Sequence, residues 1–114
     1  MTYTNPPVED RWASAIDLAT ASTAVIPLMS AMGTSTRRVI ESVSVGNLHA
    51  TVNNVVRILS GTRLVDTVTV QPNGGTATHT FNPALPCDVN AAVNFQGISA
   101  AATFIAVQGF NIKG

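Results

Sequence analysis

Hydrophobic and polar residues alternate along most of the chain after Gly33, with the period of two that a half-buried β-strand requires. The clearest run covers residues 39–45 and ends at Gly46-Asn47. Over residues 63–71, one face is mostly apolar and the other mostly polar. The pattern predicts strands over residues 39–45, 51–59, 63–71, 76–81, 89–96 and 103–110.

Short sequences rich in glycine, asparagine and proline separate these strands. Ser60-Gly61-Thr62 is short enough for a hairpin, and Pro72-Asn73-Gly74-Gly75 contains residues that accept the positive φ of a tight turn. In Asn82-Pro83-Ala84-Leu85-Pro86, each proline removes a backbone donor and fixes φ. We therefore expect no regular structure over residues 82–86.

The first third of the chain is less regular. Pro6-Pro7 excludes helix around it, so residues 1–12 are predicted to form an extended N-terminal arm. Residues 13–20 are rich in alanine and would suit a helix, but threonine and valine crowd the following segment and Pro27 interrupts it. We expect two short strands of the edge type between residues 13 and 32.

These elements together predict an all-β fold. About eight strands at roughly ten-residue spacing are typical of an antiparallel sandwich or a small barrel, and eight strands favour a jelly roll. A chain of 114 residues suffices for one domain with one core. We predict an antiparallel β-sandwich of about eight strands, jelly-roll-like, in which residues 13–114 form a single domain behind the N-terminal arm.

The composition gives the first indication of function. Hydrophobic residues make up 46% of the chain and charged residues only 11%, against about 25% charged in an average soluble protein. Six basic and six acidic residues give a formal net charge of zero, so there is no basic field to attract nucleic acid or an anionic membrane. Sparse charge and zero net charge suggest that another protein normally covers part of the surface.

The sequence carries few signals for targeting or for stabilising cross-links. The first ten residues have neither the basic region nor the apolar region of a secretory signal, and no apolar run approaches the length of a membrane span. The single Cys87 can form no disulfide within the chain and has no second cysteine for a zinc site. These features are compatible with a reducing compartment.

Candidate catalytic and metal-binding residues are few. His49 and His79 lack the close spacing that lets alternate residues of one strand bind a metal, and Cys87 has no activating residue next to it in the sequence. The aspartates at 17, 66 and 88 are isolated, so no calcium-binding loop is indicated. We expect a protein that is not an enzyme and that needs no metal or other cofactor.

Arginines form the first group of candidate partner-binding residues. Arg37-Arg38, with Arg57 and Arg63, supply four of the six basic residues, and arginine suits interfaces because its planar fork pairs with carboxylates and carbonyls. Arg37 and Arg38 are equally well interpreted as surface charges at the start of a strand.

The arm is the second group. Tyr3 and Trp12 lie on either side of Pro6-Pro7 in an otherwise polar segment, as in a docking tail that adds to a neighbour's sheet edge. The alternative is a frayed terminus with Trp12 folded onto its own core. The candidate partner-binding residues are Tyr3, Pro6, Pro7, Trp12, Arg37 and Arg38.

The strand and turn sequences from residue 37 to the end resemble those of small β-sandwich proteins of tailed-bacteriophage virions, most of all capsid decoration or cement proteins. Five segments carry the resemblance: residues 39–47, 55–62, 81–86, 90–95 and 107–110. It implies a homotrimer that binds the major capsid protein on the assembled head shell and stabilises the shell by added buried area and multivalency. It also implies a location on the capsid surface after synthesis in the host cytoplasm.

The resemblance sets expectations for each surface. Val and Ile faces are expected in the core, uncharged Thr and Ala faces at the trimer seams, and the arm and arginines against the capsid, with no nucleic acid or membrane partner. Two alternatives remain: an adaptor of the phage tail, neck or baseplate, and a receptor-binding module that recognises carbohydrate. Only 5% of the chain is aromatic, which counts against a sugar site. A metal-dependent jelly-roll enzyme is a more distant alternative.

Overall fold

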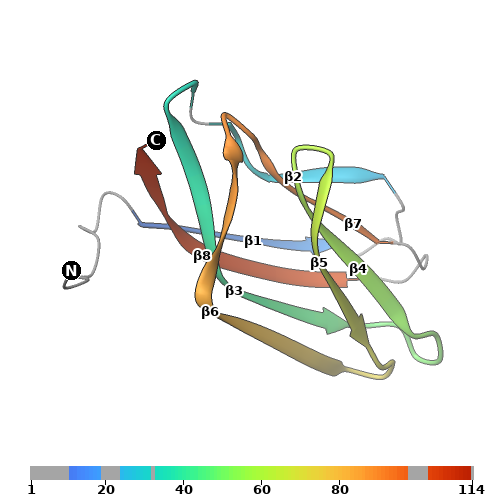
Figure 1. Cartoon of the computed structure of the whole chain (residues 1–114). Helices are drawn as coiled ribbons and strands as arrows, with labels where there is room; N and C mark the ends of the chain where they lie inside the picture. Colours follow the sequence, from blue (N-terminus) through green and yellow to red (C-terminus); the bar gives the residue numbers. More distant parts are fainter. Residues whose placement is uncertain (1–10, 19–23, 32, 98–102, 114) are drawn as a thin grey trace.

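The computed structural model describes residues 11–18, 24–31, 33–97 and 103–113, and these form two antiparallel sheets of four strands each (Figure 1). Sheet A has the order β1-β8-β3-β6, and sheet B has the order β2-β7-β4-β5. No helix in these residues is long and apolar enough to span a membrane. The strands are β1 (Arg11–Leu18), β2 (Val25–Met29), β3 (Thr36–Asn47), β4 (Asn54–Ser60), β5 (Arg63–Val70), β6 (Gly75–Val89), β7 (Val93–Gly97) and β8 (Thr103–Lys113).

The strand pairing is that of a jelly roll, which confirms the predicted fold class. The chain folds back on itself around the β4–β5 hairpin, so that β3 pairs with β6, β2 with β7 and β1 with β8. The pairings of β3 with β8 and of β4 with β7 then complete the two sheets. Two such layers bury their facing side chains between them and leave the outer faces to solvent or to a partner.

Local sequence explains most of the strand boundaries. The β4–β5 hairpin turns at Gly61, whose φ is 60°, and the β5–β6 hairpin turns at Asn73 and Gly74, whose φ values are 62° and 80°. Both turns are where the sequence predicts them. The two strands expected between residues 13 and 32 are also confirmed as edge strands, β1 of sheet A and β2 of sheet B. Pro27 is tolerated in β2 because an edge strand has one unpaired side.

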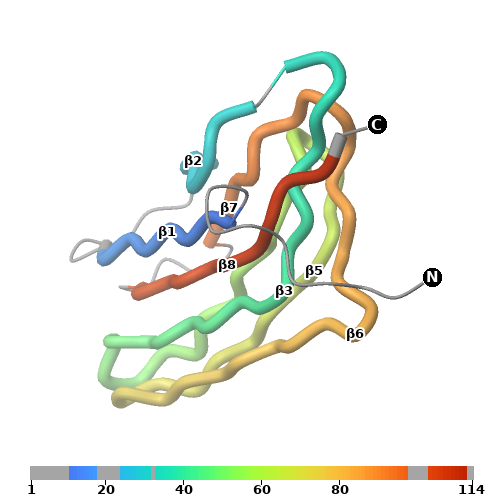
Figure 2. Tube along the Cα trace, turned by 90° about the vertical axis from the view of Figure 1, so that its left-hand side faces the viewer, coloured from blue at the N-terminus to red at the C-terminus, as the bar shows by residue number. Residues whose placement is uncertain are grey.

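The prediction of no regular structure over residues 82–86 is wrong. These residues lie within β6, which forms the other edge of sheet A and so tolerates Pro83 and Pro86. The strand is irregular there, because its pairing with β3 shifts register between Ile40 and Ser42. The pairing of β3 with β8 shifts at the same place, and β6 bends sharply near its middle (Figure 2). The bend divides the outer face of sheet A into two parts.

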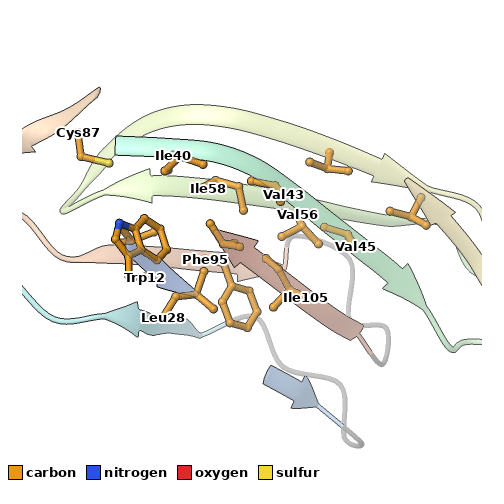
Figure 3. Close-up of a cluster of buried hydrophobic side chains, with 14 residues drawn as sticks. Trp12, Leu28, Ile40, Val43, Val45, Val56, Ile58, Cys87, Phe95 and Ile105 are labelled. Carbon is orange, nitrogen blue, oxygen red and sulfur yellow. The ribbon is translucent and has the colours of Figure 1, made fainter. Parts of the chain in front are cut away.

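Mostly aliphatic side chains from both sheets form the core (Figure 3). Trp12 and Leu28 lie at one end of this cluster, and Val45 and Ile105 lie at the other. Phe95 of β7 is the largest side chain that is fully buried. The core therefore extends between the sheets as the alternation predicts. Its buried members are Trp12, Leu28, Ile40, Val43, Val45, Val56, Ile58, Val68, Val70, Cys87, Val93, Phe95, Ile105 and Val107.

Candidate functional site

The outer face of sheet A beyond the bend is almost without charge. Alternation along each strand points one set of side chains away from the core, and the strand register aligns them in rows across all four strands. Asp17 is the one charged residue in these rows. We call them the small-residue face. The rows are Ala13–Gln108–Ser42–Thr80, Ala15–Ala106–Ser44–Thr78 and Asp17–Phe104–Gly46–Thr76.

The small-residue face has both a hollow and a protrusion. Alanine and serine leave a hollow of about 390 Å³ over β1, β8 and β3, lined mainly by Ala13, Ala15, Ser42, Ser44, Ala106 and Gln108. Phe104 stands in the adjoining row and is 41% exposed. The hydroxyls of Ser44 and Thr78 lie 3.0 Å apart and form a hydrogen bond across the strands. Such a surface can be covered by a partner without removing many charges from water.

Sheet B carries a larger hollow on its own outer face. Its volume is about 560 Å³, and we call it the Arg57 hollow. Val25 on one edge strand and Leu64 on the other are about half exposed and form its walls. The exposed side chain of Arg57 forms no hydrogen bond or ion pair with any other residue that the structure describes. The remaining lining residues are Leu59, Gly61, Thr62, Asn94 and Gln96.

A third hollow lies on sheet A on the other side of the bend. It measures about 450 Å³ and is strongly apolar, with Phe110 and Ile112 of β8 beside the irregular part of β6. The first residue of β1, Arg11, pairs with Phe110. The chain therefore enters the sandwich next to this hollow, which we call the apolar hollow. Its other lining residues are Val39, Asn82, Pro83, Ala84 and Pro86.

Trp12 belongs to the core and not to the arm. It lies in β1, is 7% exposed, and its indole Nε1 donates to the carbonyl oxygen of Phe110 at 3.1 Å. The alternative in which Trp12 folds onto its own core is thus what the structure shows. The arm expected over residues 1–12 overlaps β1 by its last two residues, and Tyr3, Pro6 and Pro7 lie outside the described residues.

Arg38 is also directed into its own subunit. It is 3% exposed, and its guanidinium carbon lies 5.6 Å from the centre of the Trp12 ring. Nε donates to the carbonyl oxygen of Ser30 at 2.8 Å and Nη1 donates to Oδ1 of Asn111 at 3.2 Å. Burial lowers the pKa of Arg38. The side chain is already surrounded, so in this conformation it is not free for the partner contact that the sequence suggested. Arg37 is half-buried on β3.

Several of the titratable groups in the described part of the chain form pairs. Asp88 accepts a hydrogen bond from Nε of Arg63 at 3.0 Å and a longer one from Ser60, and the Arg63 bond is the main reason that the pKa of Asp88 is lowered. Nδ1 of His79 lies 2.8 Å from Asp66. Burial raises the pKa of the Cys87 thiol, which disfavours the reactive thiolate.

The remaining histidine has a local structural role. Nδ1 of His49 accepts hydrogen bonds from the backbone N–H groups of Thr51 and Val52, both at 3.1 Å. The ring therefore organises the β3–β4 connection. No group of three or more His, Cys, Asp or Glu side chains in the described part of the chain could hold a metal ion.

The sequence pattern predicts the small-residue face in outline but does not predict the Arg57 hollow. Uncharged threonine and alanine faces were expected, and the period of two is the signal that locates them. The Arg57 hollow had no such signal, because its walls come from strands far apart in the sequence, Val25 in β2 and Leu64 in β5. Only the strand order brings them onto one face.

Comparisons with known proteins yield distant structural likenesses only. No model of a protein family matches the chain, and no curated protein matches it. A structure of disulfide-linked pili of Bacillus endospore appendages is 17% identical, with 90% of this chain and 86% of that chain covered and a TM-score of 0.46. The virus-like particle of the extra small virus of the prawn Macrobrachium rosenbergii is 12% identical, with 97% and 93% covered and a TM-score of 0.44.

The coat protein of Tobacco streak virus is a third example, 9% identical, with 93% of this chain and 90% of that chain covered and a TM-score of 0.40. These three structures are a pilus and two virus proteins, and none of them is described as a tailed-phage decoration protein. Their TM-scores all lie below 0.5, so the likenesses assign neither a family nor a function to this chain.

Proposed function

We propose that this chain is a structural protein of a virus particle, specifically a capsid decoration or cement protein that binds the assembled head shell as a homotrimer and stabilises it. The observation that carries the proposal is the small-residue face. A sheet face with one charge in three rows is poorly suited to permanent exposure but well suited to close contact with another protein. The jelly-roll topology is compatible with this role, since capsid proteins are among those built on it.

The N-terminal arm supplies the contact with the shell in this proposal. The described chain begins at Arg11, beside the apolar hollow. Residues 1–10 are therefore joined to the sandwich at a point where the described residues leave an apolar hollow. Tyr3, Pro6 and Pro7 of the arm, together with Arg37, are the residues proposed to bind the major capsid protein. Extended segments of this kind bind by wrapping or by strand addition.

Stabilisation of the shell follows from mass action. A protein that binds the assembled shell but not its separated subunits lowers the free energy of the assembled state. A trimer presents three arms at once, so the second and third arms bind at a high effective concentration. Modest affinity at each arm is then sufficient for occupancy of a lattice. The proposed role is mechanical and requires no chemical step.

The test is co-sedimentation of the purified chain with assembled shells and, separately, with tails of the same virus. We expect the full chain to sediment with shells and a variant lacking residues 1–10 to remain in solution. This variant keeps all of β1, including Trp12, so its far-ultraviolet circular dichroism and melting temperature should match those of the full chain. Equal binding by the truncated and full chains would refute the role of the arm.

The same experiment separates decoration from the alternatives. Binding to tails and not to shells would make the chain an adaptor and refute decoration. Among the described aromatic residues, Trp12 and Phe95 are buried and Phe81 packs against the core, while Phe104 is the one large exposed ring. A sugar site that depends on stacked rings gains little support from this distribution.

A further inference from the structure

The two outer faces of the sandwich have complementary shapes. On the small-residue face, Phe104 protrudes beside a hollow lined by small side chains. On sheet B the arrangement is reversed, because Val25 and Leu64 protrude on either side of the larger Arg57 hollow. A protruding apolar side chain on each face is therefore matched by a hollow on the other. Interlocking of this kind buries apolar surface without leaving voids.

The two faces also carry complementary charges. Asp17 is the register partner of Phe104 and lies beside it on the small-residue face. Arg57 is exposed and lines the Arg57 hollow. Within the described part of the chain, neither Asp17 nor Arg57 forms a hydrogen bond or an ion pair. By contrast, the exposed Arg63 is already paired with Asp88. Asp17 is thus the one charged residue in the rows of the small-residue face, and Arg57 is the one charged residue that lines the Arg57 hollow.

We propose that the small-residue face of one copy docks on the Arg57 hollow of a second copy. Phe104 of one copy enters between Val25 and Leu64 of the next, and Asp17 pairs with Arg57. This deepens the proposed function, because it assigns the contact between copies on which the homotrimer rests. The contact is head-to-tail, since the two faces belong to different sheets. Such contacts form a ring when the rotation between copies closes.

Like-with-like docking is disfavoured by the same charges. A two-fold contact centred on the Arg57 hollow would bring Arg57 against Arg57, and neither cation would gain a carboxylate. A two-fold contact centred on the Asp17–Phe104 row would likewise bring Asp17 against Asp17. Head-to-tail docking instead places Phe104 in the Arg57 hollow and Asp17 against Arg57. Interfaces select one partner over another by complementary contacts of this kind.

A charge exchange tests the contact directly. We would measure molar mass by light scattering after size exclusion, over a dilution series at low salt, for the full chain and four variants. Asp17→Arg and Arg57→Asp alone should each raise the dissociation constant about tenfold or more, because they place like charges together. The double variant with both changes should recover assembly to within about threefold of the unaltered chain. Phe104→Ser should weaken assembly without changing the fold.

A matched control has the same net charge as the exchange variant. Glu41 lies in β3, five residues before Gly46 and away from the Asp17 row. Combining Glu41→Arg with Arg57→Asp should fail to restore assembly. The proposal is overturned if the unaltered chain is monomeric throughout, if the single variants assemble as it does, or if the exchange variant does not recover.

Co-sedimentation with shells separates this contact from the proposed function. An exchange variant that assembles but does not bind shells would leave the contact standing and refute decoration. An Arg57→Asp variant that assembles as the full chain does and binds shells as tightly would refute the contact and leave decoration standing. Circular dichroism verifies that each variant folds, which is expected because Asp17, Arg57 and Phe104 are all exposed.

Discussion

Among the described glycines, Gly109 is the one where an added methyl group should lower the unfolding free energy most. It lies in β8 between Trp12 of β1 and Ile40 of β3. A Cβ built on Gly109 would overlap the carbonyl oxygen of Val39 and would lie 2.9 Å from Cζ2 of Trp12. The oxygen belongs to the backbone of a central strand, so it cannot move without disturbing the pairing of β3 with β8. Glycine is therefore required here for close approach of a neighbouring chain.

The expected cost of Gly109→Ala is about 3 kcal/mol of unfolding free energy, at the upper end of what overpacking costs. For a domain of this size that corresponds to a melting temperature lower by roughly 10 °C or more. Gly46→Ala is the matched control, because its Cβ would meet Phe104 Cβ at 3.7 Å and Thr76 Cγ2 at 3.8 Å, which are ordinary contacts. This variant should change stability by less than about 1 kcal/mol, in the stabilising direction.

Urea denaturation followed by circular dichroism measures both variants, at one low protein concentration so that assembly does not contribute. The fluorescence of Trp12 provides a second probe, since it should shift only if the ring leaves its site against Gly109. If Gly109→Ala and Gly46→Ala unfold within 1 kcal/mol of each other, the close approach of β3 to β8 is not as described and the reasoning fails.

Two further predictions concern buried polar groups. Asn47→Ala removes hydrogen bonds from Nδ2 to the carbonyl oxygens of Val52 (2.7 Å) and Val70 (3.2 Å) and one from the backbone N–H of His49 to Oδ1 (3.0 Å). It should lower the unfolding free energy by about 2–3 kcal/mol in urea, and a loss below about 0.5 kcal/mol would contradict this. Burial raises the pKa of the Cys87 thiol, so a disulfide reagent should react with the native protein only at higher pH than with free cysteine. Above the ordinary pKa of cysteine, the thiol of the unfolded chain ionises before that of the native chain, so the unfolding free energy should fall as pH rises. Equal reaction rates of the thiol in native and urea-unfolded protein would contradict the raised pKa.

Sequence patterns locate the strands because strand formation is largely local. The period of two at residues 39–45 and the turn residues Asn73 and Gly74 act within a few positions, and the structure places β3 and the β5–β6 turn accordingly. Residues 82–86 were mispredicted because the tolerance of proline depends on strand order. That β6 is an edge strand is a property of the whole sheet and cannot be seen in a local window.

The roles of Trp12 and Arg38 depend on contacts that a single sequence does not show. The residues after Trp12 have the pattern of an edge strand. Nothing near Trp12 in the sequence indicates that its hydrogen-bond partner is Phe110, almost a hundred positions later. Arg38 stands next to Arg37, yet one is buried and the other only half-buried, since alternation sends them to opposite faces of β3. A buried arginine without a carboxylate is held here by carbonyl and amide oxygens and by the indole face.

At the start of β1, the same contacts separate the residues that the fold needs from the residues proposed to bind the shell. Trp12 is fixed by Phe110, Arg38 and the space left at Gly109, so any truncation that removes it would leave the Arg38 guanidinium without its aromatic neighbour and open one end of the core. Loss of shell binding in such a variant would report unfolding. Removal of residues 1–10 keeps every residue of this cluster in the chain. Docking by the arm can therefore be measured separately from the stability of the sandwich, because the two depend on different residues on either side of Arg11.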